Sequence, residues 1–378
     1  MSVWDELVGQ EPAVAELQRA VTDPSAMTHA WLFTGPPGSG RSNLARAFAA
    51  ALQCVHGGCG ECHDCTTTLR GTHPDVTVVA TEGVNILIDA VRPLVELAQR
   101  SPSQGRWRVI LVEDADRLVE KTSNVLLKAL EEPAPRTVWM LCAPSPQDVL
   151  VTLRSRSRAV ALRVPPVDAV VRLLVERDGI DPDDAQVAAR AAQSHVGIAR
   201  RLARDPEARA RRSRVLELAA GIRGVGDAVL AAGELVATAQ ADAKAATEER
   251  DATERAALLR AMGADAGATI PPALRTQVRQ LEEDQKRRAT RAQRDVLDRA
   301  MVDLLSLYRD VLVVQLGADV ALVNAAHEET VRALAARSTP EQTLRRMDAV
   351  GQARTRLEGN VAPLLAVEAM AVALRPQG

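Results

Sequence analysis

The amino-acid sequence predicts an α/β domain built on a parallel sheet with flanking helices, followed by a part made only of helices. In the first 165 residues, short apolar runs alternate with stretches that carry apolar residues at helical spacing. This alternation is typical of a doubly wound parallel sheet. From residue 167 onward there is no convincing strand. Apolar residues make up 47% of the chain but aromatic residues only 2%, which favours packed helices over an aromatic-rich β-sandwich.

Three strands of the sheet can be predicted individually. HAWLFTG (29–35) is a short apolar run that ends in glycine, and a stretch with helical spacing, SNLARAFAAALQC (42–54), follows it. WRVILVEDAD (107–116) has the pattern of a buried strand that ends in acidic residues. TVWMLCAP (137–144) is another buried strand, in which Cys142 is expected to be a plain core residue.

The helical remainder is uneven. Residues 167–225 predict short helices interrupted at Asp181-Pro182 and Asp205-Pro206. Two long stretches, 227–262 and 274–316, predict an antiparallel hairpin with a turn at GADAGATIPP (263–272). The outer part of the second helix, 282–295, has no large apolar residue, so we expect it to project into solvent on an alanine seam. The inner part carries an apolar stripe that needs a core: Val296, Leu297, Ala300, Met301, Leu304, Leu305, Tyr308, Val311 and Leu312. Three further helices are expected near 319–336, 340–356 and 361–374.

Composition limits the classes of protein. The formal net charge is −2, so no global basic field attracts nucleic acid. No apolar run reaches the ~18 residues of a membrane span. The start, MSVWDELVGQ, lacks the charged and apolar regions of a signal peptide, so we expect a cytoplasmic protein without membrane contact.

GPPGSGRS (35–42) has the glycine spacing of a phosphate-binding P-loop. Gly35, Gly38 and Gly40 let backbone N–H groups point at phosphate oxygens, and Ser42 could ligate Mg²⁺. Arg41 stands where the pattern has lysine, and its broad planar guanidinium makes hydrolysis-competent geometry doubtful. A chance turn between a strand and a helix is the alternative.

The strand end VILVEDAD supplies the acids that a P-loop enzyme needs, but in reversed order. The usual order is Asp, to hold Mg²⁺, then Glu, to position water; here they are Glu113 and Asp114. The alternative is an apolar strand that merely ends in acids. Together with Arg41, the exchange argues against efficient ATP turnover.

Four cysteines follow the P-loop helix: Cys54, Cys59, Cys62 and Cys65. Four thiolates at this spacing, in glycine-containing loops, suit a structural Zn²⁺. Unmetallated or redox-active thiols are the alternative. A third group of residues, TLRSRSR (152–158), follows a predicted strand and is either a functional arginine segment or a solvated basic loop.

In this order, the motifs resemble those of bacterial clamp-loader subunits of the AAA+ class of ATPases. The resemblance covers the chain except for about 230–295. It is carried by the P-loop with its inserted cysteine module and by four further segments: WDELVGQEPAVAELQRAV (4–21), NVLLKALEEPAPRTVWMLCAPSPQDVLVTLRSRSR (124–158), VGIARRL (196–202) and NVAPLLAVEAMAVAL (360–374).

The resemblance implies an AAA+ P-loop domain at 1–165, a helical lid at 166–226 and an all-α collar at 227–378 with a hairpin insertion at about 230–295. It places Arg156 at the arginine of a Ser-Arg-Cys motif that enters a neighbouring subunit's ATP site, although Ser157 replaces the cysteine. Arg200 matches the arginine of the second-sensor helix. The hairpin is absent from the family pattern; it is either a partner-binding element or an inert insertion.

Within that family, the delta-prime kind of subunit has lost the P-loop lysine, the Asp-Glu pair or both. Arg41, the Glu113-Asp114 order and Ala143-Pro144 at the first-sensor position all favour this kind over the motor subunit. The resemblance then implies a heteropentamer with motor and delta subunits, acting on a sliding clamp and primer–template DNA within the DNA polymerase III holoenzyme.

We therefore expect little ATPase activity from the chain itself, with ATP or ADP and Mg²⁺ as candidate ligands of the loop. An autonomous AAA+ ATPase, such as a motor subunit or a helicase loader, is the alternative. A zinc-dependent DNA-binding module is a weaker reading, since the cysteine segment has few basic residues and no aromatic ones.

Overall fold

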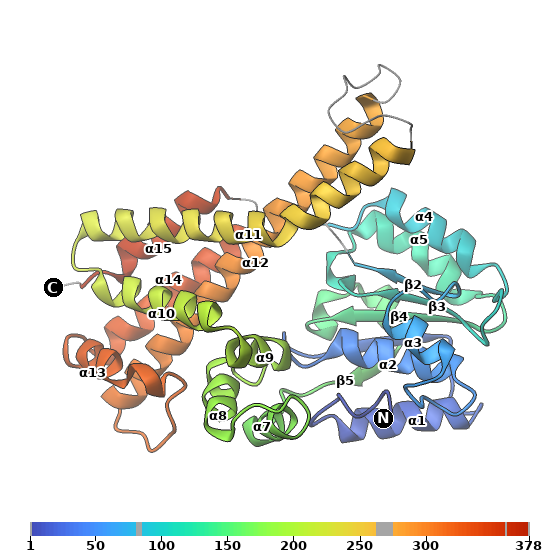
Figure 1. The fold of residues 1–378 in the computed structure, drawn as a ribbon, viewed down its shortest axis with the longest axis horizontal. Coiled ribbons are helices and arrows are strands. Elements are labelled where there is room, and N and C mark those ends of the chain that lie inside the picture. The colour runs from blue at the N-terminus through green and yellow to red at the C-terminus, as the bar shows by residue number, and fades with distance from the viewer. Residues whose placement is uncertain (1, 81–84, 262–274, 360, 377–378) are drawn as a thin grey trace. The chain divides into compact units, whose positions relative to one another are not determined.

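The computed structural model describes residues 2–80, 85–261, 275–359 and 361–376. The chain divides into two compact units, Met1–Arg204 and Asp205–Gly378 (Figure 1). The predicted turn at 263–272 lies outside the described residues. The predicted division into three domains stays a prediction.

The first unit contains a five-stranded parallel sheet with strand order β2-β3-β4-β1-β5. This confirms the predicted class of sheet. The three strands named from the sequence are present as β1 (Ala30–Thr34), β3 (Arg108–Val112) and β4 (Thr137–Ala143). The two edge strands, β2 (Val76–Val79) and β5 (Arg158–Ala161), had no individual prediction.

Helices cover both faces of the sheet (Figure 1). Alternate residues of a strand point to opposite faces. Trp31 and Phe33 therefore pack in one core with α1 (Glu11–Thr22) and α2 (Arg41–Gln53), beside the short α3 (His63–Leu69). Ala30 and Leu32 pack in the other core with α4 (Ile88–Ala98), α5 (Glu120–Glu131) and α6 (Val151–Arg154). Every residue of β1, β3 and β4 is buried, as in other sheets covered on both faces.

Three short helices complete the first unit: α7 (Val167–Glu176), α8 (Pro182–Ala191) and α9 (Val196–Arg204). The predicted breaks at the two Asp-Pro steps are confirmed. Asp181 caps α8 by accepting a hydrogen bond from the Asp183 N–H, and Asp205 caps α10 of the second unit in the same way from Glu207.

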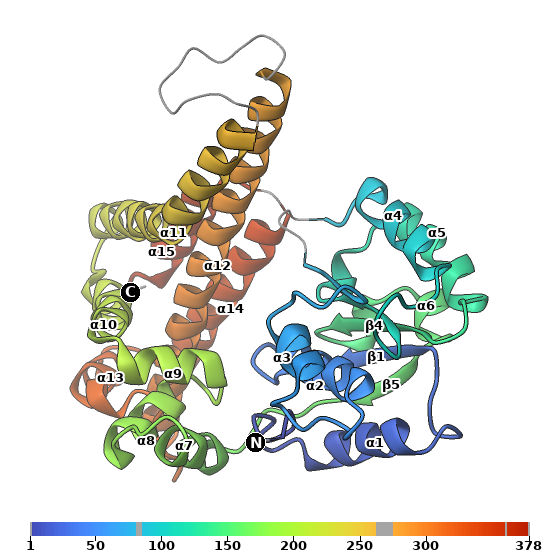
Figure 2. The same ribbon diagram turned by 45° about the vertical axis from the view of Figure 1, so that its right-hand side comes forward.

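The second unit is entirely helical in its described residues. Its helices are α10 (Pro206–Gly221), α11 (Val225–Ala261), α12 (Arg275–Gln315), α13 (Glu328–Ala336), α14 (Pro340–Glu358) and α15 (Pro363–Leu374). The two long helices α11 and α12 run side by side and extend beyond the rest of the unit (Figure 2). The inner apolar stripe of α12 is in the core as expected, with Leu297, Met301 and Tyr308 at most 1% exposed.

One helix boundary was predicted wrongly. The helix expected at 319–336 begins only at Glu328, after a short 3-10 turn at Ala325–His327. The buried carboxylate of Asp310 accepts hydrogen bonds from the backbone N–H groups of Val323 and Asn324, at 3.1 and 2.7 Å. These bonds hold the preceding residues in a loop.

Alanines and ion pairs join the outer parts of α11 and α12. Ala239 and Ala243 are buried, in line with the expected alanine seam. The Arg288 guanidinium donates to both carboxylate oxygens of Glu254, at 3.0 and 2.6 Å. These hydrogen bonds lower the pKa of Glu254 to about 2. Among the described residues, no helix is long and apolar enough to cross a membrane.

Candidate nucleotide site and metal centre

The P-loop connects β1 to α2 at the carboxyl edge of the sheet. Gly38 and Gly40 have φ angles of +87° and +89°, which residues other than glycine rarely adopt. The Gly35 N–H donates to the Pro144 carbonyl at 3.2 Å, which ties the loop to the end of β4. The loop therefore has the left-handed turns and the helix N-terminus that an anion-binding concavity requires.

Gln10, which the sequence analysis did not single out, fixes the loop from a second side. It is 3% exposed, and its Nε2 donates to the carbonyls of Ser39 and Arg163 at 3.1 and 2.7 Å. Its Oε1 accepts from the Arg163 N–H at 3.2 Å. A buried glutamine with all these bonds joins the segment before α1, the P-loop and the segment after β5 into one unit.

Arg41 folds back onto its own loop. Its Nη1 donates a short hydrogen bond to the Gly35 carbonyl. The guanidinium therefore stays beside the phosphate-binding turn, but it contacts the loop backbone rather than extending away from it as a free point charge.

Glu113 follows β3 at the same edge and is already paired. Its Oε1 accepts a hydrogen bond from Arg46 Nε at 2.9 Å, and Arg46 Nη2 lies 2.9 Å from the same oxygen. Arg46 lies on α2, one turn beyond Ser42, and was not predicted as a site residue. The carboxylate expected to serve a metal is thus compensated by a guanidinium of the same chain.

Other charges surround this pair. Burial raises the pKa of the Asp116 carboxyl, and Asp114 raises it further, while Arg117 and Arg41 act in the opposite direction. Cys142 on β4 is fully buried, as expected of a core residue; burial raises the pKa of its thiol, with smaller effects from Glu113 and Arg41. The predicted loop residues and the two acids are therefore brought together at one edge of the sheet.

His195, the residue just before α9, contacts the P-loop. A Cβ atom added to Gly38 would lie 2.8–2.9 Å from the Cβ, Cγ and Cδ2 atoms of His195. His195 therefore packs directly against the Cα of Gly38, and a side chain there would displace it. The sequence signal for this contact was only its position before the VGIARRL segment.

Among the described residues, the contacts of Arg200 are with acidic side chains and not with the P-loop. Its Nε donates to Asp178 Oδ2 at 2.7 Å, and its Nη1 lies 3.8 Å from a carboxylate oxygen of Glu6. Its part in nucleotide binding stays a prediction.

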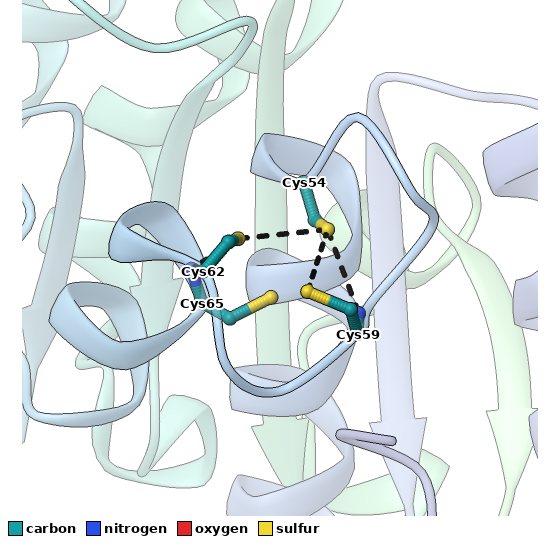
Figure 3. A group of neighbouring side chains, drawn as sticks. All are labelled: Cys54, Cys59, Cys62 and Cys65. Atoms are coloured by element: carbon teal, nitrogen blue, oxygen red, sulfur yellow. Dashed lines mark hydrogen bonds between the residues drawn. The ribbon is translucent and has the colours of Figure 1, made fainter. Parts of the chain in front are cut away.

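The four cysteines of the inserted module converge (Figure 3). Their Sγ atoms all lie within 4.8 Å of one another, and Cys54 Sγ is 3.7 Å from those of Cys59 and Cys62. A tetrahedron with Zn–S bonds of about 2.3 Å has sulfur–sulfur edges of about 3.8 Å. The thiols of Cys54, Cys59, Cys62 and Cys65 therefore have the arrangement that would hold a zinc ion.

The local backbone favours thiolate at Cys54, while burial raises the pKa of the Cys62 and Cys65 thiols. Burial raises the pKa of Cys54, but hydrogen bonds from the N–H groups of Cys59, Gly58 and His56 outweigh it and lower the pKa to about 6. Cys54 and Cys65 are fully buried and belong to the core beneath the sheet. The module is thus anchored in the core at two of its four corners.

Part of the chain is similar to known subunits of DNA polymerase III. A family model described as DNA polymerase III, delta subunit, matches residues 9–166. The delta' subunit of DNA polymerase III from Escherichia coli K12 is 36% identical over 177 residues, which cover 45% of this chain and 53% of that protein. The delta' subunit from Bacillus subtilis is 28% identical over 218 residues, covering 57% and 66%. The similarity to delta' subunits of DNA polymerase III therefore covers about half of this chain and about a half to two thirds of those relatives.

The chain is also similar to gamma/tau subunits of DNA polymerase III. The gamma/tau subunit from Mycobacterium tuberculosis H37Rv is 33% identical over 188 residues, covering 48% of this chain but only 32% of that protein. This chain spans about a half to two thirds of the delta' relatives and about a third of this gamma/tau relative. Among solved structures, a gamma subunit-related protein from Thermotoga maritima covers 96% of this chain with 16% identity and a TM-score of 0.42.

Zinc content tests the metal centre. We expect one zinc ion per chain by elemental analysis, and Cys62→Ser should lose it because a hydroxyl is a much poorer zinc ligand than a thiolate. The variant should unfold at a lower temperature while the sheet stays folded. Cys142→Ser, which removes a buried thiol outside the cluster, should keep the zinc. Purified wild-type protein without zinc would contradict the assignment.

Proposed function

We propose that this chain is a delta-prime-type subunit of a DNA polymerase III clamp loader. In this role it would join motor and delta subunits in a heteropentamer that places a sliding clamp on primer–template DNA. It would hydrolyse little ATP itself and would donate Arg156 to the ATP site of a neighbouring subunit. The observation that carries this proposal is the position of Arg156, just before the first residue of β5.

Arg156 and the P-loop lie at opposite ends of the strands: Arg156 before the amino-terminal end of β5, and the P-loop after the carboxyl end of β1. β5 is parallel to β1, with Arg158 in register with Trp31, so Arg156 lies before the amino-terminal end of β5. The P-loop begins after the carboxyl end of β1, whose five residues span about 17 Å. An arginine at this edge is out of reach of its own P-loop, which favours action on another subunit.

The three arginines of the TLRSRSR segment have different surroundings. Arg158 pairs with Glu16 at 2.7 Å and lies 5.2 Å from the ring centroid of Trp31, so it supports the fold. Arg154 donates to the Pro146 carbonyl at 3.3 Å.

Arg156 is 38% exposed and pairs with Glu131, itself 47% exposed, at 2.6 Å. Exposed ion pairs of this kind contribute at most about 1 kcal/mol, so a neighbouring triphosphate could take over the guanidinium. During phosphoryl transfer, a bidentate guanidinium stabilises the charge on the phosphate oxygens.

The contacts at the chain's own P-loop favour the proposal that it hydrolyses little ATP. Arg41 contacts the loop carbonyl of Gly35, and Glu113 is held by Arg46. A hydrolytic P-loop site needs a lysine at the phosphates and a free acid for metal and water. The rival role of an autonomous ATPase requires both.

ATP hydrolysis by the isolated chain tests this part. We expect negligible turnover at saturating ATP, well below the order of 1 s⁻¹ of ordinary enzymes. Arg41→Lys alone should not restore it, because Glu113 remains paired and the acids remain exchanged. Turnover by the wild-type chain at ordinary enzyme rates would favour the autonomous ATPase.

Arginine variants in a reconstituted clamp loader test the role of Arg156. Arg156→Ala should leave the chain folded and able to join the complex, while DNA-stimulated ATPase activity falls by roughly 10³-fold or more at the adjoining site. Arg156→Lys should rescue poorly, because an ammonium presents a single point charge.

Arg154→Ala and Arg158→Ala are the matched controls. Arg158→Ala should lower the melting temperature, because it removes the contacts of Arg158 with Glu16 and Trp31. Its effect on ATPase activity should be much smaller than that of Arg156→Ala. Equal losses from all three alanine variants, or full activity with Arg156→Ala, would leave this chain a purely structural role.

A further inference from the structure

We propose that the P-loop of this chain binds a nucleotide polyphosphate without Mg²⁺, with the guanidiniums of Arg41 and Arg46 supplying the positive charge. This inference concerns the ligand of the chain's own site within the proposed clamp-loader role. It begins from a disagreement between the residues present and the metal that a P-loop site ordinarily uses.

The carboxylate available to a metal is already engaged. Glu113 is 16% exposed on its side chain, and two nitrogens of Arg46 contact its Oε1 at 2.9 Å. A charge-assisted hydrogen bond to a largely buried carboxylate is stronger than an exposed ion pair. Mg²⁺ would have to displace a guanidinium from this oxygen.

The surrounding charge also disfavours a metal. Mg²⁺ demands near-octahedral oxygen ligands and gives up its water reluctantly, so it binds where carboxylates are free. Here Arg46 neutralises Glu113, and Arg41 places a second cation beside the loop. The carboxylates of Asp114 and Asp116 at the same edge are in turn opposed by Arg41 and Arg117, so a dication meets little net negative charge.

The same features still attract an anion. The turns at Gly38 and Gly40 and the N-terminus of α2 form a phosphate-binding concavity. Ser39, in the middle of the loop, is 2% exposed, and its hydroxyl has no hydrogen-bond partner among the described residues. This hydroxyl lies inside the loop, beside Gly35 and closed off from solvent, so the anion would be bound by the backbone N–H groups and not by this side chain.

Binding of a fluorescent ADP analogue to the full chain tests the inference, in EDTA and in excess Mg²⁺. We expect binding in EDTA to be at least as tight as in Mg²⁺. A requirement for Mg²⁺ would overturn the proposal. Absence of binding under both conditions would also overturn it, while the reconstituted complex with Arg156→Ala would still report separately on the clamp-loader role.

Two variants of the ion pair should act in opposite directions. Arg46→Ala removes a cation and frees Glu113, so binding in EDTA should weaken by about tenfold or more, and Mg²⁺ should now improve it. Glu113→Gln removes the competing carboxylate and keeps Arg46, so binding in EDTA should be unchanged or tighter.

Arg92→Ala is the matched control, because Arg92 is an exposed arginine on α4 that pairs only weakly with Asp89 at 3.4 Å. It should not change binding. Circular dichroism checks that each variant is folded. Equal losses of binding in Arg46→Ala and Glu113→Gln would show that the pair only holds the structure together, and would overturn the proposal.

Discussion

Burial of both faces of a parallel sheet is the constraint on which the first unit depends. Because β1, β3 and β4 are covered on both sides, they are continuous apolar segments, and polar groups gather where the strands end. Parallel pairing then brings the P-loop, Glu113 and Pro144 to one edge. The same pairing places Arg156 at the other edge, before β5. The separation between the P-loop and Arg156 follows from strand direction alone.

Charge compensation distinguishes this P-loop from the arrangement that ATP hydrolysis needs. Arg46 on α2 neutralises Glu113, and Arg41 turns toward the loop backbone. Each contact uses a group that catalysis would need free. The glycine turns, the N-terminus of α2 and the Gln10 bonds that hold the loop do not depend on those groups, so the binding shape is retained.

The cysteine module is linked to the same framework. Cys54 follows directly from α2, and Cys65 is buried in the core that α2 shares with the sheet. The amino-terminal residues close over it: Val3 donates its N–H to the Gly58 carbonyl at 3.0 Å, and Trp4 Nε1 donates to Gly57 at 3.3 Å. A metal at the module would therefore hold the start of the chain against the helix that carries the P-loop.

The sequence by itself determined the features that depend on local pattern. The three central strands, the two long helices, the four-cysteine cluster and the Asp-Pro helix starts each carry their signal within a few residues, and the family resemblance added the class of protein. The edge strand β5 was not predicted individually, because only one of its four residues is buried and its stability comes from pairing with β1. Only the tertiary structure brought Arg46 to Glu113, Gln10 to Ser39 and His195 to Gly38. These pairs are 29 to 157 residues apart in the chain, and a single sequence does not encode which distant polar groups will meet when burial requires them to be paired.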